Sequence, residues 1–592
     1  MHDLMHDLAQ EVAEDEIIVG NSLPKTLSKK VRQLFLDGEE WTESSFPKGN
    51  IRTCYMYTKI DSQLVKPLIE NWSFLRSLRL YVPDAEYLPK SICQLLHLRY
   101  LDLSDNIKLE KLPNSIAKLY NLQSNCGGLP CMPLGINQLT NLQYLTHFKV
   151  GKVSSIGNQF GGQLNDLKLL VNLRGELRIK IHENLVNKLE NKWESGYLEH
   201  IMNLKVIRIF FSYEPKYEAL IKKLKPNRNL MHFELELYYG TEIPRWGRAQ
   251  DDWSITFPNL VNIELGHCQR LRGIPLLSNL KHLKTLSLWL LNNLEYMETN
   301  AIGGRGFFPS LEFLNLVDLK RLKGWWGGVG ESDMPHWQPL FPRLWTVVIQ
   351  SCPKLTSLPP CPSLESLEVE RINKAFRILP APQGSANLHV RVDSVGYLTT
   401  VHTTHLITKI EIQNDYKLKR LSEIEKVFKS CSSLRSLEIE KCARLTSISG
   451  ALEHLTALES LVLMDIPTLE DNADDMPWRS LCHNLRFLCL VSLRSLQMLP
   501  RGMKHLTALQ DLQISDYKSL KGLLEWISCL ASLQSLLIVS FPGLKSVGTI
   551  QNITSLQKLK ILDCPDLREA CQEPSGKEWP NIRHIPHISI SQ

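Results

Sequence analysis

Several features that mark common protein classes are missing from this chain of 592 residues. No apolar run approaches the roughly 18 residues that span a bilayer, and no secretory signal is evident, so we expect a cytoplasmic location, with the nucleus as the alternative. The fourteen cysteines include no CxxC pair, which argues against a disulfide or zinc framework. Because the net charge is only +6, we expect no nucleic acid partner.

A phosphate-binding loop is also missing, since VGKVS and SGKEW lack the first glycine of G-x-x-x-x-G-K-[ST]. We therefore expect no nucleotide hydrolysis, no cofactor and no catalytic residue in this chain. His2 and His6 would share a face of a helix, as zinc ligands do. However, Leu4, Leu8 and Val12 form an ordinary amphipathic stripe and no third ligand is evident, so we expect no metal site.

Leucine is what the sequence has in abundance, in a repeated L-x-x-L-x-L pattern whose best-kept spacings are 23 or 24 residues. A leucine often recurs eleven residues after the first one, and chance does not keep that register. The pattern begins at Leu75, Leu98, Leu260, Leu283, Leu311, Leu344, Leu364, Leu434, Leu458, Leu485, Leu509, Leu533 and Leu556, with weaker copies at Val31, Ile51, Leu142, Leu204, Leu230 and Ile407.

Two apolar residues spaced by two on a short strand put both side chains on one face, and the next leucine returns to the same interior. One repeat cannot bury that face alone, whereas stacked repeats can. The pattern predicts an α/β fold, a leucine-rich-repeat solenoid (horseshoe) with a concave parallel β-sheet. Segments such as 88–98, 112–122 and 499–509 would form the convex returns.

Breaks in the pattern predict the domain boundaries. Residues 1–20 would be a helical remnant, 21–74 the first repeats, 75–570 the main array and 571–592 a C-terminal cap. Irregular segments are expected near 145–200 and 371–406. Residues 122–136 run from one convex return almost directly into the next, which indicates a shortened or missing repeat.

Small residues recur eight positions after the first leucine, at Asn106, Cys268, Cys352, Cys442 and Cys564. At this turn position a small polar group can bond to neighbouring backbone, and one cysteine per repeat makes a ladder rather than a tetrahedral metal cluster. Cys126 and Cys131 are close in sequence but have no evident histidine partners. We interpret the cysteines as structural.

Polar residues occupy the outward strand positions of most repeats, as a solvated face requires. Toward the end of the chain these positions become apolar, and an apolar patch that faces solvent usually binds a partner. The alternative is that loops fold over the patch and cover it. The candidate partner-binding residues are Val462, Met464, Phe487, Cys489, Val491, Leu537 and Val539.

The opening MHDLMHDLAQEVAEDE, together with KVRQLFLD, LPKSICQLLHLRYLDLSDN, NQLTNLQYLTHFKVG, LRGELRIK and EWPNIRHIPHI, closely resembles plant intracellular NB-LRR (NLR) disease resistance proteins of the coiled-coil type. The resemblance covers nearly the whole chain, from the MHD motif through the repeats. It implies that residues 1–20 are the end of a winged-helix subdomain, in which His2 and Asp3 would contact ADP or ATP in a full-length receptor.

The same resemblance implies a recognition module without enzymatic activity. It would sense a pathogen effector or a guarded host protein, and would restrain the nucleotide-binding module in cis or in trans. Everything that the family places before the MHD motif is missing from this sequence, so the resemblance implies the carboxy-terminal half of a receptor, either a fragment or a truncated gene product. The alternative is a stand-alone leucine-rich-repeat adaptor, such as a ubiquitin-ligase substrate-recognition subunit, although residues 1–30 look too short for an F-box-like segment.

Overall fold

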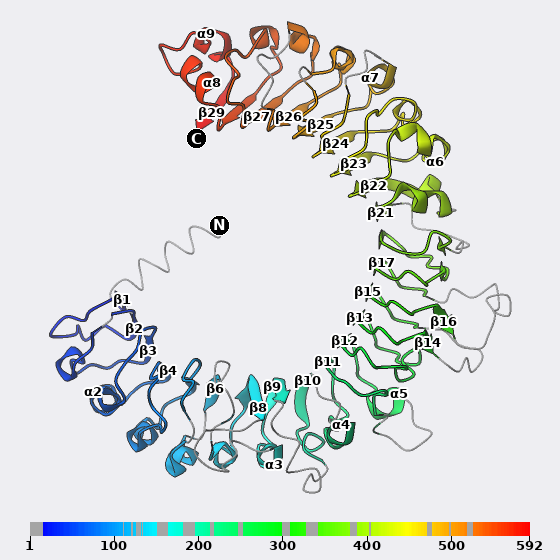
Figure 1. Ribbon diagram of the computed structural model, residues 1–592. Helices are drawn as coiled ribbons and strands as arrows, with labels where there is room; N and C mark the ends of the chain where they lie inside the picture. Colours follow the sequence, from blue (N-terminus) through cyan, green and yellow to red (C-terminus); the bar gives the residue numbers. More distant parts are fainter. Residues whose placement is uncertain are drawn as a thin grey trace. The chain divides into compact units, whose positions relative to one another are not determined.

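The computed structural model describes residues 16–591 except 39, 110–111, 120–121, 126–131, 133, 151–163, 182–195, 213–217, 245, 247–252, 299–307, 327–340, 379–386, 402–403, 471–475, 497–498 and 518–524. The chain divides into two compact units, Met1–Thr299 and Asn300–Gln592. In each unit, parallel strands line one side and short helices line the other (Figure 1). The predicted α/β repeat solenoid is confirmed.

The first unit holds two runs of parallel strands in which each strand pairs with the next. One run comprises β1 (Ile17–Gly20), β2 (Gln33–Leu36), β3 (Thr53–Met56), β4 (Ser77–Arg79), β5 (Tyr100–Asp102), β6 (Gln123–Asn125) and β7 (Tyr144–Leu145). The other comprises β8 (His147–Val150), β9 (Arg174–Ile181), β10 (Asn203–Phe211), β11 (His232–Glu236), β12 (Asn262–Gly266) and β13 (Thr285–Trp289). The remaining elements are β14 (Tyr296–Glu298) and helices α2 (Val65–Asn71), α3 (Leu164–Leu167), α4 (Glu218–Lys223) and α5 (Trp253–Thr256).

The second unit continues the same architecture with one main run of parallel strands. The run comprises β15 (Phe313–Val317), β17 (Thr346–Gln350), β19 (Ser366–Glu370), β21 (Leu388–Val392), β22 (Ile407–Gln413), β23 (Ser436–Glu440), β24 (Ser460–Met464), β25 (Phe487–Val491), β26 (Asp511–Ser515), β27 (Ser535–Val539), β28 (Lys558–Leu562) and β29 (His587–Ser591). The outer elements include β16 (Gly324–Trp326), β18 (Ser357–Leu358), β20 (Arg377–Ile378), α6 (Glu425–Ser430), α7 (Met476–Ser480), α8 (Pro565–Ala570) and α9 (Trp579–Ile582).

Alternation of side chains along each short strand builds the core. In β23, Leu437 and Ile439 are fully buried while the residues between and beside them are half-buried. Fully burying an aliphatic side chain of this size contributes about 1.5–3 kcal/mol, so stacked leucines can stabilise the array. The predicted convex returns are short 3₁₀ helices, at Lys90–Gln94, Asn114–Lys118 and Arg501–His505.

A left-handed turn follows the strands at a constant place in the repeat. The residue seven positions after the first leucine has a positive φ at Asp105 and in the repeats that begin at Leu230 and later, as at Lys441 (φ 54°), Asp516 (φ 58°) and Asp563 (φ 52°). Residues other than glycine rarely adopt this backbone conformation, and among them asparagine and aspartate tolerate it best. This turn redirects the chain from the strand toward the outer side of the repeat.

One prediction about the ends and irregular segments needs correction, and the structure adds detail to three others. Residues 17–20 belong to strand β1 rather than to a helical remnant, because the β-branched pair Ile17–Ile18 pairs in parallel with β2. The repeat near 122–136 is shortened but not missing, since β6 pairs with both β5 and β7. The irregular segment 371–406 still supplies β21 to the sheet, with a register shift after Leu388. The expected cap adds one more strand, β29, beside β28.

Candidate functional site

The predicted partner-binding residues lie on the strand face of the second unit, where β24, β25, β26 and β27 stand side by side in register. Val462 pairs with Cys489, which pairs with Gln513, which pairs with Leu537. Two residues further along each strand, the next row consists of Met464, Val491, Ser515 and Val539. The sheet therefore brings together residues that are up to about eighty positions apart in sequence.

Burial separates Cys489 from the other candidates. Val462, Met464, Phe487, Val491, Leu537 and Val539 are half-buried. Cys489 is only 9% exposed, and burial raises the pKa of its thiol to about 11. It therefore contributes little contact surface. We use the name apolar strip for Val462, Met464, Phe487, Val491, Leu537 and Val539.

The apolar strip is not continuous, contrary to the sequence prediction. Strand β26 lies between β25 and β27 and presents Asp511, Gln513 and Ser515 at the outward positions. Side chains of adjacent strands that share a register position are direct neighbours. The polar residues of β26 therefore divide the strip into a β24–β25 part and a β27 part.

A network of charged side chains adjoins the strip on strands β19 to β23. At its centre is Glu411 of β22, which is 3% exposed. The Arg391 Nε donates to Glu411 Oε2 at 2.6 Å, the Lys409 Nζ lies 2.5 Å from Oε1, and the His389 Nε2 lies 3.0 Å from Oε1. The His389 contact is the largest cause that holds the pKa of Glu411 far below its ordinary value, and Lys409 and Arg391 add to it against the opposite effect of burial.

The pKa values of the carboxyl groups around Glu411 shift in the opposite direction. Burial raises the pKa of Glu438 and of Glu370, and nearby carboxylates raise both further, Glu411 for Glu438 and Glu368 for Glu370. Lys409 lies 3.8 Å from Glu438, and Arg391 lies 3.7 Å from Glu368. The carboxyl groups outnumber the cations that neutralise them, so this part of the face is acidic. Glu438 and Glu440 pair with Val462 and Met464, which places the acidic part directly beside the strip.

Sequence reasoning did not find this network. Lys409 and Glu411 are two residues apart on one strand, and the sequence shows this directly. Arg391 comes from the neighbouring strand β21. Its position beside Glu411 can be known only from the register of β21 and β22, which shifts after Leu388. The predicted cysteine ladder, by contrast, is confirmed where the structure describes it. The Cys268 Sγ donates to Gly266 O at 3.2 Å and the Cys564 Sγ to Leu562 O at 3.2 Å, both from buried positions.

In the first unit, His232, Glu234 and Glu264 bring their ligand-type atoms within 4.8 Å of one another. The Arg208 guanidinium is bonded to the Glu234 carboxylate and its Nε also lies 3.0 Å from Glu176. Burial, and next the charge of Arg208, lower the pKa of His232. An arginine that already neutralises the central carboxylate makes this cluster an ion-pair network rather than a set of metal ligands.

The remaining predicted site residues, His2 and Asp3, lie outside the described residues, as do Cys126 and Cys131. Within the described part of the chain, none of the helices combines the length and apolar character needed to cross a membrane.

The comparisons with known proteins agree with this architecture. Residues 51–370 match the family model described as leucine-rich repeat region. Disease resistance protein RGA1 of Solanum bulbocastanum is 25% identical over 483 residues, which cover 76% of this chain and 43% of the relative. Disease resistance protein At3g14460 of Arabidopsis thaliana is 28% identical over 414 residues, which cover 60% of this chain and 28% of the relative. The chain thus spans less than half the length of these relatives.

Among solved structures, the crystal structure of a TLR13-ssRNA13 complex matches with a TM-score of 0.52 at 16% identity and covers 96% of this chain and 83% of that chain. A similarity at this identity concerns the repeat fold alone. The family model covers more than half of the chain, and the relatives are plant disease resistance proteins. The chain therefore belongs to the leucine-rich repeat region family, and its resemblance to the repeat region of plant NB-LRR disease resistance proteins is confirmed.

Proposed function

We propose that this chain is the non-enzymatic recognition module of a plant immune receptor, and that it binds a pathogen effector or a modified host protein through the strand face of its second unit. The observation that carries the proposal is the apolar strip on β24, β25 and β27, next to the acidic face of β19 to β23. Apolar side chains that remain half-open on a concave repeat surface are typical of a protein interface.

In a longer receptor the module would also restrain the nucleotide switch, in the cytoplasm or nucleus, and His2 and Asp3 would belong to the ADP or ATP site. This role follows from the resemblance to NB-LRR proteins. A restraint of this kind is a population shift, in which the repeats bind the resting state more tightly than the active one. The chain itself is proposed to bind no cofactor and to hydrolyse no nucleotide.

The test compares proteins retained by the tagged chain in leaves with and without pathogen challenge. The double variant Val462→Glu/Val491→Glu places charge on the strip, whereas Val348→Glu changes the equivalent outward position of β17 in the same unit. After challenge, we expect the wild type and Val348→Glu to retain the same protein. The double variant Val462→Glu/Val491→Glu should not retain it. Equal retention by all three would contradict the proposed surface. Turnover of ATP by the purified chain would contradict the non-enzymatic role.

A further inference from the structure

Four arginines occupy one register position on four neighbouring strands of the first unit. Arg32, Arg52, Arg76 and Arg99 immediately precede the strand segments that begin at Gln33, Thr53, Ser77 and Tyr100. The backbone N–H of each arginine donates to the carbonyl of the one before it, from Arg52 to Arg32, from Arg76 to Arg52 and from Arg99 to Arg76, each at 2.7 Å. We call this set the arginine ladder.

At the outer end of the arginine ladder, Glu16 precedes β1 in register with Arg32, whose N–H donates to the Glu16 carbonyl. Arg52, Arg76 and Arg99 have only other arginines of the ladder, or Leu122, at the same position on the neighbouring strands. The residues two positions before the arginines are Lys30, Asn50, Phe74 and His97, and the residues one position after them are Gln33, Thr53, Ser77 and Tyr100. Arg52, Arg76 and Arg99 are exposed, and the described residues place no carboxylate in ion-pair contact with them. Like charges directly opposite each other on adjacent strands destabilise a sheet. A ladder of one sign is therefore unfavourable in the free protein.

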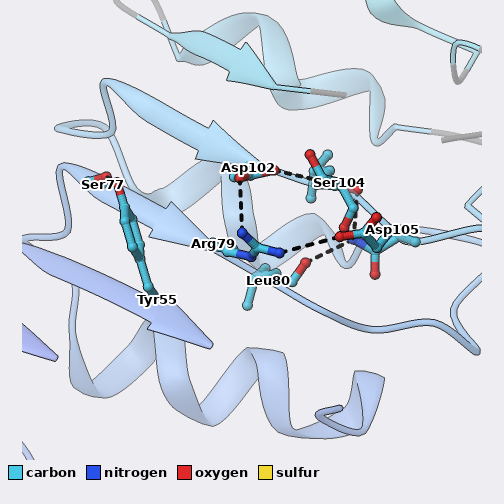
Figure 2. A network of polar contacts seen from close by, with 9 residues as sticks. Tyr55, Ser77, Arg79, Leu80, Asp102, Ser104 and Asp105 are labelled. Atoms are coloured by element: carbon cyan, nitrogen blue, oxygen red, sulfur yellow. Dashed lines mark hydrogen bonds and ion pairs between the residues drawn. The ribbon is translucent and has the colours of Figure 1, made fainter. Parts of the chain in front are cut away.

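Two other arginines show how this protein neutralises a strand-face cation elsewhere. In Figure 2, Arg79 of β4 lies between two carboxylates, with its Nη2 at 3.3 Å from Asp105 Oδ2 and its Nη1 at 3.8 Å from Asp102 Oδ2. In the second unit, Glu459 occupies the ladder position between Arg435 and Arg486, and Arg435 Nη1 lies 3.3 Å from Glu459 Oε1 on the next repeat. Unlike Arg79 and Arg435, the exposed Arg52, Arg76 and Arg99 have no such carboxylate among the residues that the structure describes.

The spacing of the ladder indicates the shape of what it binds. Neighbouring strands are about 4.8 Å apart, so the four arginines span about 14 Å. An α-helix rises about 5.4 Å per turn, and carboxylates on one face over three turns span about 16 Å. Side chains on one face of an extended strand are about 6.7 Å apart and would span about 20 Å for the same number. The span of the ladder is closer to that of the helix than to that of the extended strand. Flexible arginine side chains can therefore reach carboxylates on a helix more easily than carboxylates on a strand.

We propose that the arginine ladder is a docking site for an acidic α-helix of a protein partner, which presents one carboxylate per turn along the ladder. Each guanidinium offers a planar set of donors that matches a carboxylate. The proposal concerns a surface of the first unit and does not depend on the apolar strip of the second. Failure of either proposal therefore leaves the other standing.

The probe is a synthetic alanine-rich helical peptide with one glutamate per turn over about four turns, and its control carries glutamine at the same positions. Binding to the full chain is measured by fluorescence anisotropy at low and at high salt. We expect the glutamate peptide to bind and the glutamine peptide not to bind. The variant Arg52→Gln/Arg76→Gln should weaken binding about fivefold or more, as two exposed ion pairs would. The matched control Arg435→Gln/Arg486→Gln, at the same repeat position, should bind as the wild type does.

Equal binding of the peptide by the ladder variant and the wild type would overturn the proposal. Tighter binding of a single-stranded RNA, lost in Arg52→Gln/Arg76→Gln, would also overturn it, because the ladder would then be a phosphate-binding surface. A second readout is thermal unfolding at low salt. Relief of repulsion predicts that the ladder variant unfolds at the wild-type temperature or above it, with a gap that closes as salt screens the charges. A lower unfolding temperature would show that the ladder supports the fold, which contradicts the reasoning.

Discussion

Replacing Glu411 with glutamine should destabilise the centre of the second unit, because three basic side chains converge on this carboxylate. Removing one partner of a fully buried ion pair costs about 3–5 kcal/mol. Here the side chains of Arg391 and Lys409 are each 37% exposed, so water can solvate them after the carboxylate is lost. Glutamine also keeps one carbonyl acceptor for the donors. We therefore expect a loss of about 2 kcal/mol at neutral pH.

The loss should depend on pH in a defined direction. The pKa of Glu411 in the folded protein is held below its ordinary value of 4.5. A carboxyl group with a lowered folded-state pKa contributes stability above its unfolded-state pKa, and this contribution disappears as pH falls through the folded-state pKa. The difference between wild type and Glu411→Gln should thus be complete at pH 7 and should shrink below about pH 4.5.

Local unfolding is the quantity to measure, because it reports on the repeats around Glu411 rather than on the whole array. Hydrogen exchange of peptides that cover β22 and β23 gives the local free energy of opening for wild type and variant at each pH. Arg435→Gln, which removes an exposed ion pair on the neighbouring repeat, serves as the control and should change little. A loss below about 0.5 kcal/mol at pH 7, or a loss that stays constant down to pH 3.5, would refute the reasoning about Glu411.

Three further predictions concern the core, the turn and the thiols. Leu437→Ala, at a position with 0% exposure in β23, should cost about 2–5 kcal/mol, whereas Glu438→Ala should cost little; hydrogen exchange of β23 checks both. Asn106→Ala should cost about 1–3 kcal/mol, because Asn106 donates to two carbonyls at 2.8 Å and accepts from the Val82 N–H at 2.5 Å. The Val82 amide should then exchange faster, and unchanged exchange would contradict this. At pH 8, an alkylating reagent should label exposed Cys529 and spare Cys489, whose pKa is about 11; mass spectrometry of the labelled peptides decides.

The sequence by itself determined the repeat fold because its signal is local. The spacing of leucines within about a dozen residues predicts which side chains enter the core, and the buried Leu437, Leu461 and Leu488 lie where that spacing puts them. The turn position also follows from the pattern, since the cysteine ladder and the left-handed residue before it recur at fixed distances from the first leucine. The outward positions of the apolar candidates were predictable for the same reason.

Only the tertiary structure decided which outward residues meet. Gln513 divides the apolar strip because β26 lies between β25 and β27, and Arg391 reaches Glu411 because the register shifts after Leu388. The arginine ladder likewise exists only across strands, since its members are separated by twenty residues or more in the sequence. Contacts between strands depend on register and loop length, and a shift of one residue changes every partner. A periodic pattern predicts the face of each residue, whereas stacking of the repeats sets its neighbours.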